Sequence, residues 1–284
     1  MKIQFPFDDS IGRLGAVRPA AAVAGLEPKP RSAILRRVCW LMAAFWSSSL
    51  SIAADGVPMA KGDTILFYGN AMVERLLEQG ELEAYLQIAY AGHHLRIRSL
   101  AWTGDEVGHR LRPDGFADHL RTLLAAWPAN VVVMGFGMNE SFNGVAGVNE
   151  FRAQLETYLR EIARRHPQAR LVMLSPIAVE PGGPVDATVR NREVAAYVEE
   201  IAATARRSQA LFVDLFSPSR TAYAHSPAPL TAYGIHLNAI GTREMARVIA
   251  RALLGDALMA RVNVGRIDEV ARAAAQKSHH VAAI

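Results

Sequence analysis

The sequence of 284 residues predicts an α/β fold, a three-layer α/β/α sandwich around a five-stranded parallel sheet. Short apolar segments alternate with longer amphipathic segments along residues 60–255. The segment 130–136 is continuously apolar at its centre, as expected for a strand that is covered on both faces. Strands separated by helices in this order favour a parallel sheet with helices on both sides.

Five strands and five helices are expected in this region. The strands are predicted at residues 64–68, 95–100, 130–136, 170–174 and 211–215. The helices are predicted at residues 71–79, 116–126, 148–166, 187–207 and 239–254, from apolar residues at helical spacing and from the breaks between segments. In such folds the functional residues gather just after the carboxyl ends of the strands, so we look for a site there.

The first 54 residues are expected to form a disordered leader followed by a secretory signal peptide. Arg36 and Arg37 precede a short apolar run, and small residues ending at Ala53 and Ala54 follow it. A basic segment, a short apolar core and a small-residue exit are typical of a cleaved signal, with a buried helix or an uncleaved anchor as the alternative. We therefore expect an exported protein, periplasmic or extracellular, that has no stable membrane span after cleavage.

Beyond the leader we expect one domain, residues 55–255, and a charged, Ala-rich tail, residues 256–284. A single helix is predicted within the tail, at residues 267–275. The adjacent His279 and His280 lie near its end. Paired histidines can bind metals, but terminal pairs are mostly solvated.

The charge and the cysteine content exclude several classes of function. The net charge is +4, but residues 1–54 carry seven Lys/Arg and three Asp/Glu, which leaves 24 of each in the remainder. A neutral domain gives no indication of nucleic-acid binding. The single cysteine, Cys39, excludes an intrachain disulfide and a thiolate metal cluster. We expect no metal and no other cofactor.

Four short segments carry polar residues or glycines where the fold predicts a site. They are GNA at residues 69–71, WTGDE at 102–106, GFGMNE at 135–140 and GIHLN at 234–238. The first three follow predicted strands, and the fourth precedes the last helix of the domain. In order and spacing they resemble the four blocks of the SGNH (GDSL-type) hydrolase and esterase superfamily, across residues 62–254. The resemblance implies a flavodoxin-like sheet and an ester substrate.

The resemblance also implies roles for individual residues. In that superfamily a serine attacks an ester carbonyl, and a histidine oriented by an aspartate takes its proton. His236 corresponds to this base, while Gly104, Asn139 and the backbone N–H of residue 71 correspond to the donors that hold the oxyanion. The positions expected to bind substrate, a small-molecule, carbohydrate or lipid ester, are Gly69, Asn70, Glu140 and Tyr233.

Two positions depart from the pattern of the superfamily in a way that changes the chemistry. Ala71 stands where the nucleophilic serine is expected, and Tyr233 stands where the aspartate three residues before the histidine is expected. Asn70 also replaces the aspartate of the first block. Loss of the nucleophile of such a triad costs on the order of 10⁶ in rate. A serine mechanism through residue 71 is therefore excluded.

Three mechanisms remain open from the sequence. His236 could activate water directly, a serine such as Ser141 or Ser175 could enter the site, or the pocket could only bind. Carboxylates that could orient His236 instead of the missing aspartate are those of Glu74, Glu140 and Asp214. We expect either a divergent esterase or acyl-group hydrolase, or a catalytically inactive pseudoenzyme that binds a carbohydrate, carboxylate or protein ligand.

Overall fold

The structure is a computed structural model that describes residues 56–110 and 128–282. The expected leader and the helix predicted at residues 116–126 lie outside the described residues. Within them, no helix combines the length and the apolar composition that a membrane span requires.

Five parallel strands form the central sheet, which confirms the predicted α/β fold. Their order across the sheet is β2-β1-β3-β4-β5, and every neighbouring pair is parallel. Each lies within or overlaps a predicted strand: β1 (Thr64–Gly69), β2 (Arg96–Ser99), β3 (Val131–Gly135), β4 (Arg170–Leu174) and β5 (Leu211–Val213).

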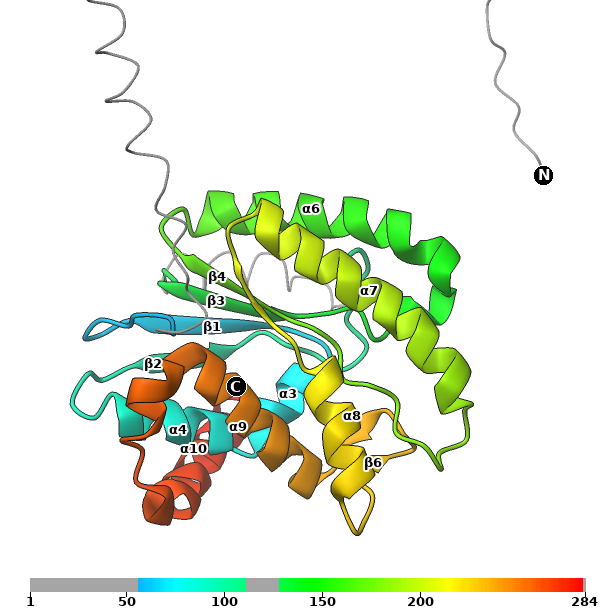
Figure 1. Cartoon of the computed structure of the whole chain (residues 1–284). Coiled ribbons are helices and arrows are strands. Elements are labelled where there is room, and N and C mark those ends of the chain that lie inside the picture. The colour runs from blue at the N-terminus through cyan, green and yellow to red at the C-terminus, as the bar shows by residue number, and fades with distance from the viewer. Residues whose placement is uncertain (1–55, 111–127, 283–284) are drawn as a thin grey trace, which may run out of the picture. The chain divides into compact units, whose positions relative to one another are not determined.

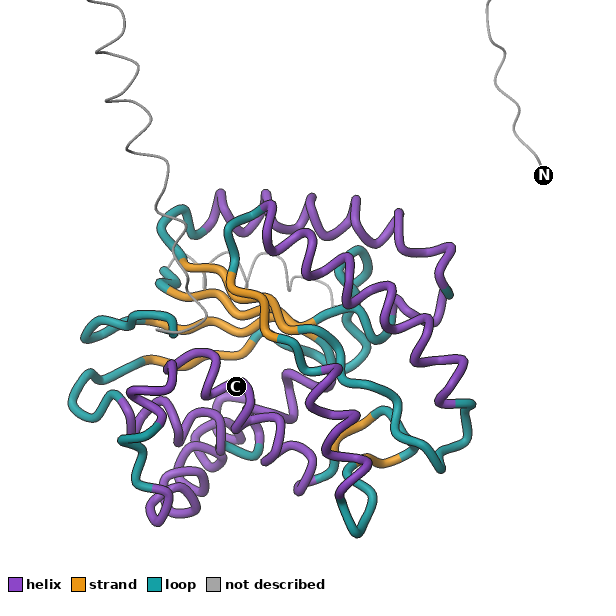
Figure 2. The backbone as a smooth tube through the Cα atoms, viewed as in Figure 1, coloured by secondary structure: helices purple, strands orange, loops and turns teal. Residues whose placement is uncertain are grey.

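Helices cover both faces of this sheet (Figures 1 and 2). One face is covered by α6 (Val148–Arg165) and α7 (Ala187–Arg207). The other is covered by α3 (Ala71–Glu78), α4 (Glu81–Ala89) and α9 (Ala239–Met259), and α10 (Ile267–Ala282) packs against α3 and α4. After β5 come α8 (Phe216–His225) and a small antiparallel hairpin of β6 (Thr231–Ala232) and β7 (His236–Leu237). The short 3₁₀ turns are η1 (Glu140–Asn143), η2 (Val145–Gly147) and η3 (Val264–Arg266).

The strand side chains alternate between two hydrophobic cores. On β1, Ile65 and Phe67 belong to the core beneath α3, α4 and α9, whereas Leu66 and Tyr68 belong to the core beneath α6 and α7. This alternation follows from the two-residue period of a strand. Because both faces are covered, β1 and β3 are buried along their whole length.

Helix α4 was not expected from the sequence. Gly80, at φ +77°, ends the preceding segment, and the new helix begins with Glu81 and Glu83, which are buried although acidic. Arg243 of α9 pairs with Glu81 at 3.3 Å, and Lys277 of α10 pairs with Glu83 at 2.5 Å. Taken alone, this acidic segment suggests a solvated loop. The residues that pair with its two acids lie more than 160 residues further along the chain, so the local sequence does not reveal the helix.

Helix α10 is longer than the predicted helix at residues 267–275, and it packs on the rest of the domain. Its side chains Ile267, Ala271 and Ala274 are buried. The carbonyl oxygen of Ala271 lies so close to Gly80 that a Cβ there would approach it to 2.2 Å. The segment after residue 255 therefore packs onto α3 and α4.

Candidate functional site

The first block forms a tight turn between β1 and α3. A Cβ at Gly69 would lie 2.5 Å from the carbonyl oxygen of Gly135 on the neighbouring strand, so only glycine fits. The side chain of Asn70 caps α3 by accepting the Met72 N–H at 3.1 Å, and it is 4% exposed. Ala71 is thereby placed in the first turn of α3, where backbone N–H groups have no intrahelical acceptor.

The second block is fastened to the first by backbone and side-chain bonds. The Trp102 N–H donates to the Gly69 carbonyl oxygen at 2.9 Å. The N–H and hydroxyl of Thr103 donate to one oxygen of Glu74, at 2.8 and 2.5 Å. Gly104 follows at φ +88° and is exposed, and a Cβ added to it would meet no atom within 4 Å. Its backbone therefore borders open space near the start of α3.

The third block is joined to the second through Asn139 and Glu140. The side-chain amide of Asn139 donates to the Asp105 carbonyl oxygen at 3.0 Å. The carboxylate of Glu140 accepts the Val107 and Gly137 N–H groups, both at 2.8 Å. Burial raises the pKa of Glu140, which is 3% exposed, although these two backbone bonds act in the opposite direction. Glu140 thus holds two loops together, and this geometry does not support substrate binding by its carboxylate.

The fourth block is the β6–β7 hairpin that leads into α9. His236 pairs with Ala232 across the hairpin, and Asn238 caps α9 by accepting the N–H groups of Ile240 and Gly241. Tyr233 lies at the turn with φ +57° and is 74% exposed. Its side chain therefore extends into solvent and does not close the site.

Arg75 is the charged group beside His236. Its guanidinium donates to the Leu237 carbonyl oxygen at 3.4 Å. Burial lowers the pKa of the His236 imidazole, and the positive charge of Arg75 lowers it further. Among the residues described, no carboxylate forms a hydrogen bond or an ion pair with the His236 ring. The position that an aspartate serves in the superfamily is thus unfilled by an acid, and a cation lies nearby instead.

Sequence reasoning did not assign this role to Arg75. One signal was available: Arg75 follows Ala71 by four residues, which places both side chains on the same face of a helix.

The two alternative serines are buried and fully engaged. Ser141 is 0% exposed, and its hydroxyl donates to the Met138 carbonyl oxygen at 2.6 Å while it accepts from Arg190 at 2.8 Å. Ser175 is also 0% exposed, and its hydroxyl donates to Pro176 and accepts the N–H groups of Leu215 and Phe216. Neither hydroxyl is placed to attack a ligand at Ala71.

The three carboxylates considered as partners of His236 have other bonds. Glu74 holds Thr103, and Glu140 holds two backbone amides, as described above. Asp214 caps α8 by accepting the Phe216 N–H at 2.8 Å. No group of three or more metal-ligating side chains occurs in the described part of the chain.

Comparison with known families identifies the origin of this arrangement. The model of the GDSL-like lipase/acylhydrolase family matches residues 68–244, which include all four blocks. The chain belongs to this family. The family membership accounts for the glycine turns, the capped helices and the tethered loops at one edge of the sheet. No match was found among curated proteins.

Several solved structures share the fold at low sequence identity. A protein described as a GDSL-like lipase from Parabacteroides merdae is 16% identical, with a TM-score of 0.57 over 70% of this chain and 98% of that one. A catalytic mutant of Axe2, an acetylxylan esterase from Geobacillus stearothermophilus, is 18% identical, with a TM-score of 0.55 over 70% and 97% of the two chains. LAE5, an alpha/beta hydrolase from the metagenome of Lake Arreo, is 18% identical, with a TM-score of 0.53 over 72% and 98%. These likenesses support the fold.

Proposed function

We propose that this protein binds an acyl ester or a carboxylate at the GDSL-type site and does not hydrolyse it through residue 71. The observation that carries this proposal is the first turn of α3, where Ala71 offers a backbone N–H but no nucleophile. Donors for a carbonyl or carboxylate oxygen are supplied by that N–H, by the Gly104 N–H and by the Asn139 amide.

The hydrogen bond between the loops after β3 and β2 supports this assignment of donors. An Asn side-chain amide has two hydrogens, and one of them is used by the Asp105 carbonyl oxygen. The second remains for a ligand. The positive end of the α3 dipole and the nearby Arg75 both favour a ligand with negative charge or a polarised carbonyl.

The surroundings of His236 argue against efficient turnover. A general base must become an imidazolium when it takes a proton, and the superfamily stabilises that cation with a carboxylate. Here Arg75 disfavours the cation, and no acid among the described residues is bonded to the ring. The charge beside His236 therefore opposes the step that the missing serine would need.

A second candidate function is slow hydrolysis by water. It is favoured by the lowered pKa of His236, which keeps the imidazole in the neutral form that a general base requires. In this reading Gly104 and Asn139 stabilise the oxyanion while His236 activates the water. The family relationship and the acetylxylan esterase among the structural neighbours suggest sugar esters as ligands to test.

Equilibrium binding tests the proposal. The full chain is titrated with acetate and with an acetylated xylo-oligosaccharide by calorimetry, beside Asn139→Ala and Arg261→Ala. Arg261 is an exposed residue after α9 and serves as the matched control. We expect about a tenfold loss of affinity in Asn139→Ala, the value of roughly one hydrogen bond to a charged or polarised oxygen. Equal affinity in Asn139→Ala and the natural protein would contradict the proposal.

We also propose export, from the basic, apolar and small-residue pattern at residues 36–54. Fractionation of cells that express the full chain, followed by N-terminal sequencing, tests this. Cleavage near Ala53 or Ala54 is expected. An uncleaved chain confined to the cytoplasm would contradict it.

A further inference from the structure

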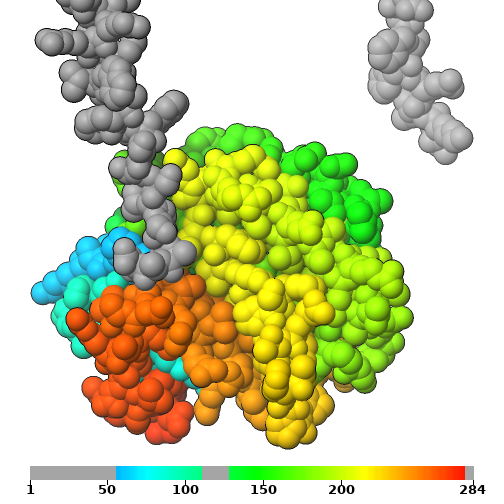
Figure 3. All heavy atoms as spheres, viewed as in Figure 1, coloured from blue at the N-terminus to red at the C-terminus, as the bar shows by residue number. Residues whose placement is uncertain are grey.

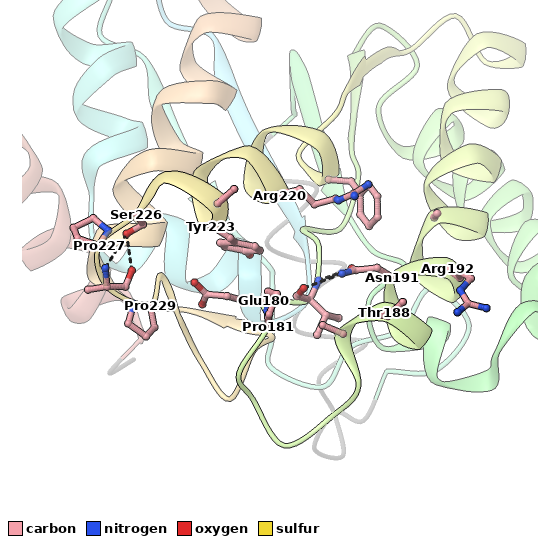
Figure 4. Close-up of a pocket in the computed structure, with 16 residues that line it drawn as sticks. Glu180, Pro181, Thr188, Asn191, Arg192, Arg220, Tyr223, Ser226, Pro227 and Pro229 are labelled. Carbon is pink, nitrogen blue, oxygen red and sulfur yellow. Dashed lines mark hydrogen bonds between the residues drawn. The ribbon is translucent and has the colours of Figure 1, made fainter.

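A cavity of about 720 Å³ lies between α7, α8 and the loop that joins β4 to α7 (Figure 4). None of Ala71, Gly104, Asn139 and His236 lines it, so it is distinct from the site described above. In Figure 3, α8 is seen at the surface, with the beginning of α7 on one side and α9 on the other. The volume is within the range of pockets that hold small organic ligands.

Much of the wall is apolar, and several polar side chains that line it are already engaged. Apolar carbon is contributed by Phe216 and by alanines and prolines of α7, α8 and the segment after α8. Asn191 bonds both the N–H and the carbonyl of Val179, and the Tyr223 hydroxyl donates to Ala178 at 3.1 Å. These two side chains therefore hold the wall together and leave little hydrogen-bonding capacity for a ligand.

The acidic residue in the wall, Glu180, is held by hydrogen bonds within the protein. Glu180 is 7% exposed, and its carboxylate accepts the N–H groups of Leu230 and Thr231 and the Thr231 hydroxyl. Its own N–H donates to the Gly234 carbonyl oxygen at 2.8 Å. Glu180 thus fixes the start of the β6–β7 hairpin, and its charge is directed into the protein.

Two arginines supply the remaining charge. Arg192 extends from α7 and Arg220 from α8, and both are exposed (Figure 4). In residues 56–110 and 128–282, neither guanidinium has a carboxylate partner, and Arg220 lies 5.8 Å from the centre of the Phe216 ring. A guanidinium presents a planar set of donors that matches an oxyacid group.

We infer that this cavity binds an amphiphilic organic anion, with its apolar body against Phe216 and the proline-lined wall and its acid group at Arg192 and Arg220. The two charges come from different helices, α7 and α8, and both residues line the same cavity. The inference does not depend on the ester or carboxylate site at Ala71, because none of the residues assigned to that site lines the cavity.

Binding of decanoate to the full chain, measured by calorimetry, tests the inference. Decanol carries the chain without the charge, and acetate carries the charge without the chain. We expect saturable binding of decanoate, with decanol at least about tenfold weaker, and any acetate binding should be unaffected by the two arginine variants. Arg192→Ala and Arg220→Ala should each weaken decanoate binding about tenfold, while the control Arg261→Ala should not.

A steric variant and a variant of the other site complete the test. Ala224→Trp places a bulky ring in the cavity from an exposed position of α8, and it should abolish decanoate binding while circular dichroism stays unchanged. Asn139→Ala should leave decanoate binding at the cavity intact, even if it abolishes binding of acetate and sugar esters. Absence of saturable decanoate binding, or binding that neither arginine variant nor Ala224→Trp weakens, would overturn the inference.

Discussion

The side-chain amide of Asn139 donates a hydrogen bond to the Asp105 carbonyl oxygen at 3.0 Å, which joins the loops after β3 and β2. Asn139→Asp replaces this donor with an acceptor that faces a carbonyl oxygen. We expect a loss of about 1–3 kcal/mol in the free energy of unfolding, because the new carboxylate would face the Asp105 carbonyl oxygen without a proton to share. Urea denaturation measures it, and Asn139→Ala should cost less. Equal stability of Asn139→Asp and the natural protein would show that the bond does not hold the loops.

Glu140 should contribute more to stability than to ligand contact. Its carboxylate satisfies the buried N–H groups of Val107 and Gly137. Glu140→Ala should lower the free energy of unfolding by about 2–4 kcal/mol, since two donors lose a charged acceptor. Glu140→Gln keeps one acceptor oxygen and should cost roughly half as much. Urea denaturation of the three proteins gives the order, and a stable Glu140→Ala variant would refute it.

Arg75 should control the pKa of His236. Burial and the Arg75 charge both lower that pKa, and only the second cause is removed by Arg75→Gln. The pKa of His236 should therefore rise in the variant, towards but not above its ordinary value of about 6.5. Titration of the imidazole signals by NMR measures it, with Arg261→Gln as the control. An unchanged pKa would show that the guanidinium does not act on the ring.

His166 should make the protein less stable in mild acid. The ring is 4% exposed, and its Nδ1 accepts the Ala129 N–H at 3.2 Å. Burial first, and then Arg165, lower the pKa of His166. Below pH about 6.5 the unfolded chain binds more protons than the folded one, so the free energy of unfolding decreases as the pH falls towards the folded pKa.

The histidine variant isolates this effect. His166→Asn cannot titrate, so its free energy of unfolding should depend less on pH between about pH 7 and pH 5 than that of the natural protein. Urea denaturation across this range compares the two slopes. His236 acts with the same sign in both proteins and so does not affect the difference. Identical slopes would mean that folding does not change the pKa of His166, and would contradict the prediction.

The sheet was predictable because its signal is local. Each strand is a short apolar run between helix-period segments, and Arg170–Leu174 and Ala187–Arg207 were predicted to the residue. Helix α4 was not predicted because its buried acids are stabilised by Arg243 and Lys277, which are remote in the sequence. Ion pairs between residues so far apart leave no periodic pattern in the local sequence, so the helix could not be inferred from it.

The place of the four blocks in the fold could be predicted from the sequence, but the charges around His236 could not. The four blocks lie at one edge of the sheet and are tied together, as their order along the chain indicated. The carboxylates proposed beside His236 proved to be bonded elsewhere, because side-chain direction is decided by loop packing. Arg75 took its place beside the hairpin only through the close contact of α3 with β7, a contact between residues far apart in the chain.

Hydrolysis of p-nitrophenyl acetate by the full chain, beside Ala71→Ser and His236→Ala, tests the central claim most directly. We expect the natural protein to release p-nitrophenol no faster than His236→Ala does, because Ala71 has no hydroxyl and Arg75 opposes protonation of His236. We also expect Ala71→Ser to gain measurable turnover, because the oxyanion donors are in place. Turnover by the natural protein that His236→Ala abolishes would contradict the binding proposal and establish hydrolysis without a serine at residue 71.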